Sequence, residues 1–196
     1  MEQDVKVWDT ETGINCASLQ GHESDIYSIK SSTDGSYAVS VGKDRTIKIW
    51  DIRCKSFIGE MDGSGYKEMN EIALTPSGSE EVEGAGQTEG MATVGHQDGS
   101  VTMWSMRQRQ VISHNRLHDG EVRGVSYMAN GRYLASAGFD NKVVISDTSD
   151  VSNLQVVKTL EHDDKVVSVR WHPCLPILLS TSADKSARIW SPQDEK

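Results

Sequence analysis

The sequence lacks the features that mark several protein classes. Its three cysteines, Cys16, Cys54 and Cys174, are odd in number and far apart, and the chain contains no Cys-x-x-Cys spacing and no Asn-x-Ser/Thr glycosylation site. No apolar run approaches the roughly 20 residues that a membrane-spanning helix needs. The amino end shows neither the basic start nor the apolar stretch of a signal peptide. These absences predict a protein of the reducing cytosol or nucleus.

Basic residues and prolines are also scarce. The chain has 20 Lys and Arg against 29 Asp and Glu, which gives a net charge of -9. Because non-specific nucleic-acid binding needs clustered Lys and Arg, DNA and RNA are not expected as main partners. Only 4 prolines accompany 17 glycines, and Val, Ile, Ser and Thr are plentiful. This composition favours many strands joined by tight turns.

Short strand-like segments recur along the chain at a nearly fixed spacing. They are "VKVWD" near the start, "TIKIWD" at 46–51, "VTMWS" at 101–105, "VVISD" at 143–147 and "ARIWS" at 187–191. The spacing is 42 residues from Trp8 to Trp50, 42 from Trp104 to Ser146, and 44 from Ser146 to Trp190. A period of about 40–45 residues is typical of a four-stranded propeller blade.

Polar residues keep the same register in each copy. An aspartate lies 6 residues before the Trp or Ser position in four copies, at Asp44, Asp98, Asp140 and Asp184. A histidine precedes the aspartate by 22 residues in three copies, at His22, His118 and His162. In the same three copies a serine precedes it by 4, at Ser40, Ser136 and Ser180. Such agreement indicates one structural unit used repeatedly.

With "GH" at Gly21-His22 and "WD" at Trp50-Asp51, the chain resembles the WD-repeat β-propeller family. That resemblance implies a buried hydrogen-bonded tetrad of His, Ser or Thr, Asp and Trp in each blade. The tetrads would be His22/Ser40/Asp44/Trp50 and His162/Ser180/Asp184/Trp190, with His118, Ser136 and Asp140 forming a third that has Ser146 in place of the indole. Such a network satisfies polar groups inside a packed interior.

The second repeat departs from this pattern. It lacks the histidine of the "GH" pair, and its hydroxyl, Thr93, lies 5 rather than 4 residues before Asp98 because "GHQD" is one residue longer than "GKD". We nevertheless expect Thr93, Asp98 and Trp104 to form its partial tetrad. The third repeat, with Ser146, predicts either a looser blade or a neighbouring side chain that moves into the space.

We therefore predict an all-β, WD40-type propeller that is partial. Four repeats are expected at residues 10–51, 52–105, 106–147 and 148–191, after a leading strand at 4–9. An open arc would leave two blade faces exposed to water, which favours the carboxy-terminal part of a larger protein or an incomplete gene model. A closed ring of four blades is the alternative, and it would have to place the surplus strand.

An acidic insertion interrupts the second repeat. Residues 77–90, "SGSEEVEGAGQTEG", are rich in Gly, Glu and Ser and poor in apolar side chains, which predicts a solvated loop between two strands of one blade. A binding element is the alternative interpretation. Ser77, three residues before Glu80, resembles a site for an acid-directed kinase, so Ser77 and Ser79 are candidate phosphorylation sites.

No motif for catalysis, cofactor binding or metal binding stands out. His114 and His118 are four residues apart, but that spacing binds metal on a helix, and a strand and turn region is expected here. His172 lies two residues from Cys174 without further ligands. The glycines of 84–90 have the wrong spacing for a phosphate loop, and no Gly-x-Ser-x-Gly elbow occurs. We expect no enzyme, no cofactor and no metal.

The order in which the repeats depart from the pattern resembles the carboxy-terminal repeats of a WD-repeat protein of the microtubule cytoskeleton. This implies a cytoplasmic scaffold that docks other proteins, microtubule-associated proteins among them, without catalysis. "WDIR" at 50–53 supports an alternative, because it resembles the motif by which some WD-repeat proteins dock the adaptor of cullin-4 ubiquitin ligases. Asp51 and Arg53 would then contact the adaptor. An enzyme is the distant third alternative.

Overall fold

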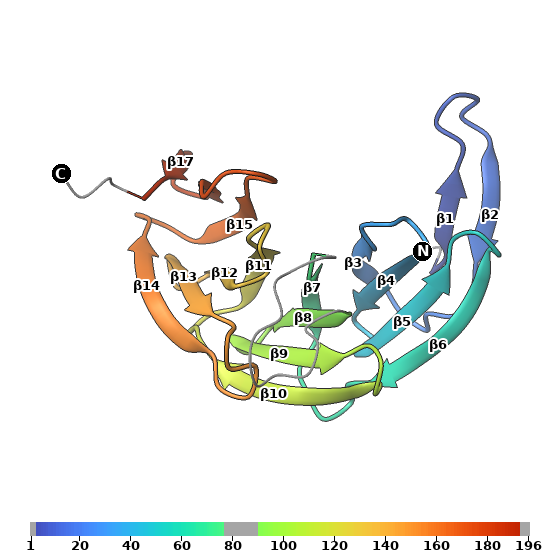
Figure 1. Ribbon diagram of the computed structural model, residues 1–196, viewed down its shortest axis with the longest axis horizontal. Helices are drawn as coiled ribbons and strands as arrows, with labels where there is room; N and C mark the ends of the chain where they lie inside the picture. Colours follow the sequence, from blue (N-terminus) through green and yellow to red (C-terminus); the bar gives the residue numbers. More distant parts are fainter. Residues whose placement is uncertain (1–2, 77–89, 193–196) are drawn as a thin grey trace.

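The chain forms an arc of antiparallel sheets. The computed structural model describes residues 3–76 and 90–192, and Figure 1 shows the sheets fanned around a common inner side. The strands, in chain order, are β1 (Val5–Trp8), β2 (Asn15–Leu19), β3 (Ile26–Ser31), β4 (Tyr37–Gly42), β5 (Thr46–Asp51), β6 (Ser56–Asp62), β7 (Met69–Leu74), β8 (Met91–His96), β9 (Ser100–Ser105), β10 (Gln110–Arg116), β11 (Val122–Tyr127), β12 (Tyr133–Gly138), β13 (Lys142–Asp147), β14 (Gln155–Glu161), β15 (Val166–Trp171), β16 (Leu178–Ser182) and β17 (Ala187–Trp190).

Three of the sheets in the described part have four strands. Sheet one has the order β3-β4-β5-β6, sheet two β7-β8-β9-β10, and sheet three β11-β12-β13-β14. Sheet four has the three strands β15-β16-β17, and β1 and β2 form a separate pair. The first strand of each sheet lies on the inner side of the arc, while β6, β10 and β14 lie on its rim (Figure 1). The prediction of an all-β fold built from propeller blades is confirmed.

The repeated segment of the sequence is offset from the sheet by one strand. The segment that ends at Trp50 and Asp51 contributes β2 to the pair with β1 and then β3, β4 and β5 to sheet one. Each segment therefore bridges two neighbouring sheets. The covalent chain passes from the rim strand of one sheet to the inner strand of the next.

The residues of each strand reflect how many of its faces are covered. The second strand of sheet one, β4, reads "YAVSVG" and is buried at all positions but the first, because the sheet has a neighbour on both faces. The rim strand β6, "SFIGEMD", is exposed except at Gly59 and Met61. Small and β-branched residues thus occupy β4, whereas the rim strand exposes apolar side chains such as Phe57 and Ile58 beside its polar ones.

An aspartate closes the turn between the second and third strands of each sheet. In sheet one, Asp44 Oδ1 accepts the backbone N–H of Thr46 at 3.2 Å, and Arg45 between them has a positive φ of 60°. In sheet two the corresponding residue is Gly99, with φ of 86°, where a side chain would also meet the His118 carbonyl. The regular position of the aspartate in the sequence therefore reflects this turn.

Apolar clusters fill the spaces between neighbouring sheets. Val39 and Ile49 of sheet one pack with Ile72, Ala92 and Trp104 of sheet two. A second cluster joins sheets two and three, and a third joins sheets three and four. Because each fully buried aliphatic side chain contributes about 1.5–3 kcal/mol, these interfaces supply most of the stability.

The outer face of sheet four is exposed. Leu179 and Ile189 pair across β16 and β17 and are 43% and 73% exposed. The residues at the same positions in sheet one, Val39 and Ile49, are 0% and 6% exposed because sheet two covers them. Sheet four thus has apolar side chains, of the kind that a neighbouring sheet covers elsewhere, on a face against which no described sheet packs.

Candidate functional site

A buried hydrogen-bonded network holds the end of sheet one. His22, in the loop before β3, contacts Asp44 through Nδ1 at 2.7 Å and Ser40 through Nε2 at 2.6 Å. The Trp50 indole N–H donates to the same Ser40 hydroxyl at 2.8 Å. The carboxylate of Asp44 also accepts the backbone N–H of Glu23 at 3.1 Å. The structure thus brings together the four residues that the register of the sequence singles out.

The partners of the imidazole fix its protonation. An ionised carboxylate only accepts, so Nδ1 of His22 carries the proton and Nε2 accepts from the Ser40 hydroxyl. Burial lowers the pKa of His22, and the bond to Asp44 only partly offsets this. Burial opposes ionisation of Asp44, but the bonds from His22 and from the Thr46 backbone outweigh it and lower the pKa of Asp44.

Sheets three and four repeat the arrangement. His118 contacts Asp140 at 2.9 Å and Ser136 at 2.8 Å. In sheet four the corresponding residues are His162, Asp184, Ser180 and Trp190. The imidazole of His162 lies 3.0 Å from Asp184 and 2.7 Å from Ser180, and the Trp190 indole donates to Ser180 at 2.8 Å.

Ser146 occupies the indole position of sheet three. It is fully buried, and its hydroxyl has no hydrogen-bond partner among the described residues. The residue before the network histidine also differs: Gly21 in sheet one, where an added Cβ would lie 3.0 Å from Trp50, and Leu117 in sheet three. Sheet four has Glu161 at this position and keeps Trp190, so the two positions do not vary together in every sheet. A looser blade and a neighbour that moves in both stay predictions for sheet three.

Sheet two uses different residues, and the prediction for Thr93 is wrong. Thr93 forms a hydrogen bond with the Tyr127 hydroxyl of sheet three at 2.5 Å and is not part of a tetrad. Asp98 accepts from the backbone and side chain of Ser100. Trp104 donates instead to Thr102 at 2.7 Å.

The register of the strands explains this correction. In sheet one, Ser40 pairs with Lys48, which lies two residues before Trp50. The equivalent of Lys48 in sheet two is Thr102, two residues before Trp104, and Thr102 pairs with Val94. Thr93 is one residue away and therefore points to the opposite face of the sheet. There it meets Tyr127, whose pKa burial raises to about 12.

His96 supplies the imidazole that the loop of sheet two lacks. Its Nε2 lies 2.7 Å from the Thr102 hydroxyl, and its Nδ1 donates to the Lys67 carbonyl at 3.0 Å. Burial lowers the pKa of His96. The Tyr66 ring covers the network, with its centroid 5.6 Å from that of His96 and 5.8 Å from that of Trp104.

The sequence holds a signal for His96 that lies outside the repeated His, Ser, Asp and Trp positions. The residue two positions before the turn aspartate is Gly42 in sheet one, His96 in sheet two, Gly138 in sheet three and Ser182 in sheet four. In sheet three a Cβ at Gly138 would lie 2.3 Å from Nδ1 of His118, so a small residue there leaves room for the histidine of the loop. Where that histidine is missing, the strand itself carries the imidazole.

Residues from all four sheets line a hollow at the inner ends of the strands. Its volume is about 420 Å³. Its walls are Tyr27 of β3, Asn70 and Glu71 of β7, Arg123 of β11 and Val167 of β15, together with Glu68, Gln97 and Glu121 in the loops next to the strands of sheets two and three. Tyr27 donates to Glu68 at 3.2 Å, and the buried Asn70 amide donates to the Val122 carbonyl at 3.1 Å. The hollow therefore has fixed walls with Tyr27, Arg123 and Val167 exposed at its mouth.

Cationic side chains flank an aromatic ring beside this hollow. The Arg123 guanidinium lies 5.3 Å and the Lys165 ammonium 5.1 Å from the centre of the Phe139 ring. Such cation–π contacts hold the two charged groups in place while leaving them in contact with water. Arg123, the Phe139 ring and Val167 thus lie on one surface.

A carboxylate in the wall of the hollow links three sheets. Glu71 of β7 accepts from Lys30 of β3 at 3.0 Å and from Arg170 of β15 at 2.7 Å. Arg170 also donates to the Val125 carbonyl of β11 at 3.1 Å. Sheet four therefore contacts sheet two directly as well as its neighbour, sheet three.

The other candidate residues lie apart from the hollow. Asp51 accepts the backbone N–H of Cys54 at 2.6 Å and so closes the turn between β5 and β6, while Arg53 in that turn is exposed. Ser77 and Ser79 lie outside the described residues. His172 accepts the backbone N–H groups of Cys174 and Leu175.

The described residues contain no group of three or more His, Cys, Asp or Glu side chains arranged to hold a metal ion. Cys16, Cys54 and Cys174 are free and exposed. His114 contacts the ring of Tyr66, with the centroids 5.2 Å apart. A helix with the length and apolar character that a membrane crossing requires is likewise absent from the described part.

The chain is similar to known WD-repeat proteins over most of its length. It is 26% identical over 185 residues to nuclear distribution protein PAC1 of Arthroderma otae, covering 89% of this chain and 40% of that protein. It is 27% identical over 191 residues to APC/C activator protein CDC20 of Saccharomyces cerevisiae, with 94% and 28% covered. It is 24% identical over 194 residues to actin-interacting protein 1 of Drosophila melanogaster, with 95% and 30% covered. The chain spans less than half the length of each.

The model of the WD domain, G-beta repeat, matches residues 13–51, 109–147 and 154–191. The segment between the first two matches holds β7, β8 and β9 of sheet two, whose network uses His96 and Thr102 in place of the repeated residues. Together the matches cover more than half of the chain, and their sheets have the strand order described above. The chain therefore belongs to the WD40 repeat family, whose domains mediate protein–protein interactions and are mostly non-catalytic scaffolds.

Proposed function

We propose that this chain is part of a cytoplasmic, non-catalytic scaffold that docks microtubule-associated proteins in the organisation of the cytoskeleton. The observation that carries the proposal is the hollow to which all four sheets contribute. Protein interfaces depend on a few exposed aromatic and arginine side chains on a rigid support. Tyr27 and Arg123 are such side chains, and the buried networks of sheets one and three stabilise the sheets that carry them.

Sequence resemblance supports the cytoskeletal part of the proposal. A repeat without its "GH" histidine, then the longer turn "GHQDG", then "ISD" and "HDDKVVSVRWHP" resemble the carboxy-terminal repeats of nemitin, a WD-repeat protein of the microtubule cytoskeleton. The names of two matched proteins point to similar roles, since one is a nuclear distribution protein and another an actin-interacting protein.

Co-sedimentation with microtubules tests the proposal. The purified chain should pellet with microtubules that carry their associated proteins and should stay in solution with polymers of tubulin alone. Arg123→Glu, which reverses the charge at the hollow, should lower the apparent affinity about tenfold or more. Arg116→Glu on the rim strand β10 is the matched control and should bind normally. Equal pelleting with bare tubulin, or none with either polymer, would refute the proposal.

A ligase adaptor is the second candidate partner. The exposure of Arg53 favours it, because this side chain is free to reach a neighbouring protein, whereas the Asp51 carboxylate already caps the turn. Arg53→Ala should abolish co-purification of the cullin-4 adaptor if this function holds and should leave microtubule co-sedimentation unchanged. Recovery of the adaptor with Arg53→Ala would count against it.

A further inference from the structure

The inner strands of the four sheets share a β-bulge at their second residue. In each strand the pairing with its neighbour shifts register there, so one extra residue is left out of the ladder. A bulge redirects the side chain of its extra residue. All four extra residues line the hollow: Tyr27 of β3, Asn70 of β7, Arg123 of β11 and Val167 of β15. The wall of the hollow is therefore built from one repeated position, and its chemistry differs from sheet to sheet.

The residue before each inner strand gives the hollow a second repeated position, and this one is charged. It is Asp25 in sheet one, Glu68 in sheet two, Glu121 in sheet three and Lys165 in sheet four. Glu68 lines the hollow and accepts from the Tyr27 hydroxyl at 3.2 Å. At these two positions sheets one and two thus contribute carboxylates, whereas sheets three and four contribute the cations Arg123 and Lys165.

Phe139 brings the two cations together. It stands directly before the turn aspartate of sheet three, where the other sheets have Lys43, Gln97 and Ala183. The centre of its half-buried ring lies 5.3 Å from the Arg123 guanidinium and 5.1 Å from the Lys165 ammonium. An aromatic ring attracts cations through its quadrupole but does not neutralise their charge. Two positive groups are therefore held at the junction of sheets three and four, and both can still pair with an anion.

Nearby carboxylates form no close ion pair with this cluster. Glu121 approaches Arg123 only to 3.9 Å, and the Arg123 side chain is 42% exposed. Asp164 accepts the backbone N–H of Lys165 at 2.7 Å, and Asp163 already forms an ion pair within sheet four at 2.7 Å. Within the part of the chain that the structure describes, the Lys165 ammonium forms no ion pair. An acidic group from outside would therefore meet two cations that lack a close internal partner.

We propose that Arg123, Phe139 and Lys165 bind an acidic side chain of a short segment from a protein partner, and that Glu68 pairs with a basic side chain of the same segment. The inference rests on the proposed docking function and adds the chemistry and the direction of the docked segment. The acidic side chain lies at the junction of sheets three and four, and the basic one lies on the side of sheet two. Complementary charges at two points fix the register of a bound segment as well as its affinity.

The rest of the wall suits a protein segment better than a polyanion. Tyr27 and Val167 are 40% and 48% exposed, so they offer apolar contacts to side chains of the segment. A nucleic acid carries negative charge at every phosphate, and part of that charge would face Glu68 and Glu121. A segment with one acidic and one basic side chain avoids this repulsion.

Selection of displayed peptides tests the chemistry of the segment. A library of random short peptides is displayed on phage and selected against the immobilised full chain. The enriched peptides should share an Asp or Glu and, at a fixed separation, a Lys or Arg. In fluorescence anisotropy the strongest peptide should bind one-to-one, and replacing its acidic residue by Lys should weaken binding about tenfold or more. Enriched peptides without an acidic residue, or no enrichment at all, would overturn the inference.

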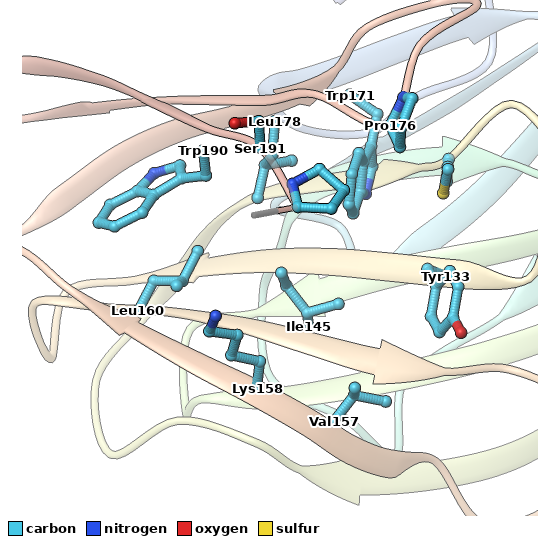
Figure 2. A pocket seen from close by; sticks show the side chains of 12 residues that line it. Tyr133, Ile145, Val157, Lys158, Leu160, Trp171, Pro176, Leu178, Trp190 and Ser191 are labelled. Atoms are coloured by element: carbon cyan, nitrogen blue, oxygen red, sulfur yellow. The ribbon is translucent and has the colours of Figure 1, made fainter. Parts of the chain in front are cut away.

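A charge swap on the chain locates the acidic side chain of the peptide. Lys165→Glu should weaken binding of the selected peptide about tenfold or more, and the peptide with Lys in place of its acidic residue should bind this variant better than the unmodified chain. Lys158→Glu is the matched control, because it makes the same change at an exposed lysine of the rim strand β14. Lys158 lies beside Ile145 and Leu160 in the wall of an apolar pocket that shares no residue with the hollow (Figure 2). Equal weakening by both variants would overturn the inference.

Further variants test the basic side chain and guard against misfolding. Glu68→Lys should weaken binding of the selected peptide, and replacing the peptide's basic residue by Glu should restore binding to this variant. Lys165→Gln removes the positive charge without adding a negative one and should also weaken binding, so it serves where Lys165→Glu does not fold. Peptide binding without microtubule co-sedimentation would refute only the proposed function. Co-sedimentation that Lys165→Glu leaves unchanged would refute only this inference.

Discussion

We predict that the hydroxyl of Thr102 is the central group of the hydrogen-bonded network in sheet two. Thr102→Val keeps the shape of the side chain but removes the group that accepts from the Trp104 indole and donates to His96. Two buried polar groups lose their partner, and each such loss costs about 1–3 kcal/mol. The free energy of unfolding should therefore fall by about 2–4 kcal/mol, measured by urea denaturation followed by circular dichroism.

A double-mutant cycle separates this network from the one the sequence predicted. Thr102→Val and His96→Phe should be coupled by about 1 kcal/mol or more, because one substitution removes the partner of the other. Thr93→Val, whose hydroxyl contacts Tyr127, should be additive with His96→Phe to within about 0.5 kcal/mol. Additivity of the first pair with coupling of the second would refute the assignment of Thr102.

Three further outcomes are expected from packing and burial. Ser146→Trp should lower the melting temperature, at a cost of about 1–3 kcal/mol, because Ser146 is fully buried and an indole would overfill the space around it; a rise in the melting temperature would contradict this. Gly42→Ala should destabilise the fold more than Gly65→Ala, because a Cβ at Gly42 would lie 2.2 Å from a main-chain carbonyl oxygen and one at Gly65 meets nothing; equal urea midpoints would contradict it. The free energy of unfolding should decrease as pH falls below about 6.5. The reason is that burial lowers the pKa of His22, so the folded state binds fewer protons than the unfolded chain. A free energy of unfolding that stays constant between about pH 7 and 5 would argue against this.

The repeats could be predicted from sequence because they are local and periodic. The turn aspartate, the strand before it and the Trp after it recur at fixed spacing, and each follows from one hairpin geometry. His22 and Asp44, 22 residues apart, meet because the spacing is constant wherever the turns have equal length. The fold and the three similar networks follow from this regularity.

Sheet two could not be predicted in the same way, since counting residues from the turn does not reveal which face a side chain takes. One extra residue before Asp98 moves Thr93 to the opposite face and brings Val94 to the position that serine holds elsewhere. The hydroxyl then comes from the neighbouring strand, at Thr102, through cross-strand pairing. The hollow of Tyr27, Arg123 and Val167 depends on the curvature of the arc, which no single repeat encodes.

The carboxylate of Glu71 bears on how the molecule unfolds. In arrays whose units contact only their nearest neighbours, stability is a sum of unit and interface energies, and an end unit can detach at low cost. Here the bond from Arg170 joins the last described sheet to the second one, past its immediate neighbour. Detaching sheet four therefore breaks interactions with two sheets at once, so a nearest-neighbour description underestimates the cooperativity of the arc.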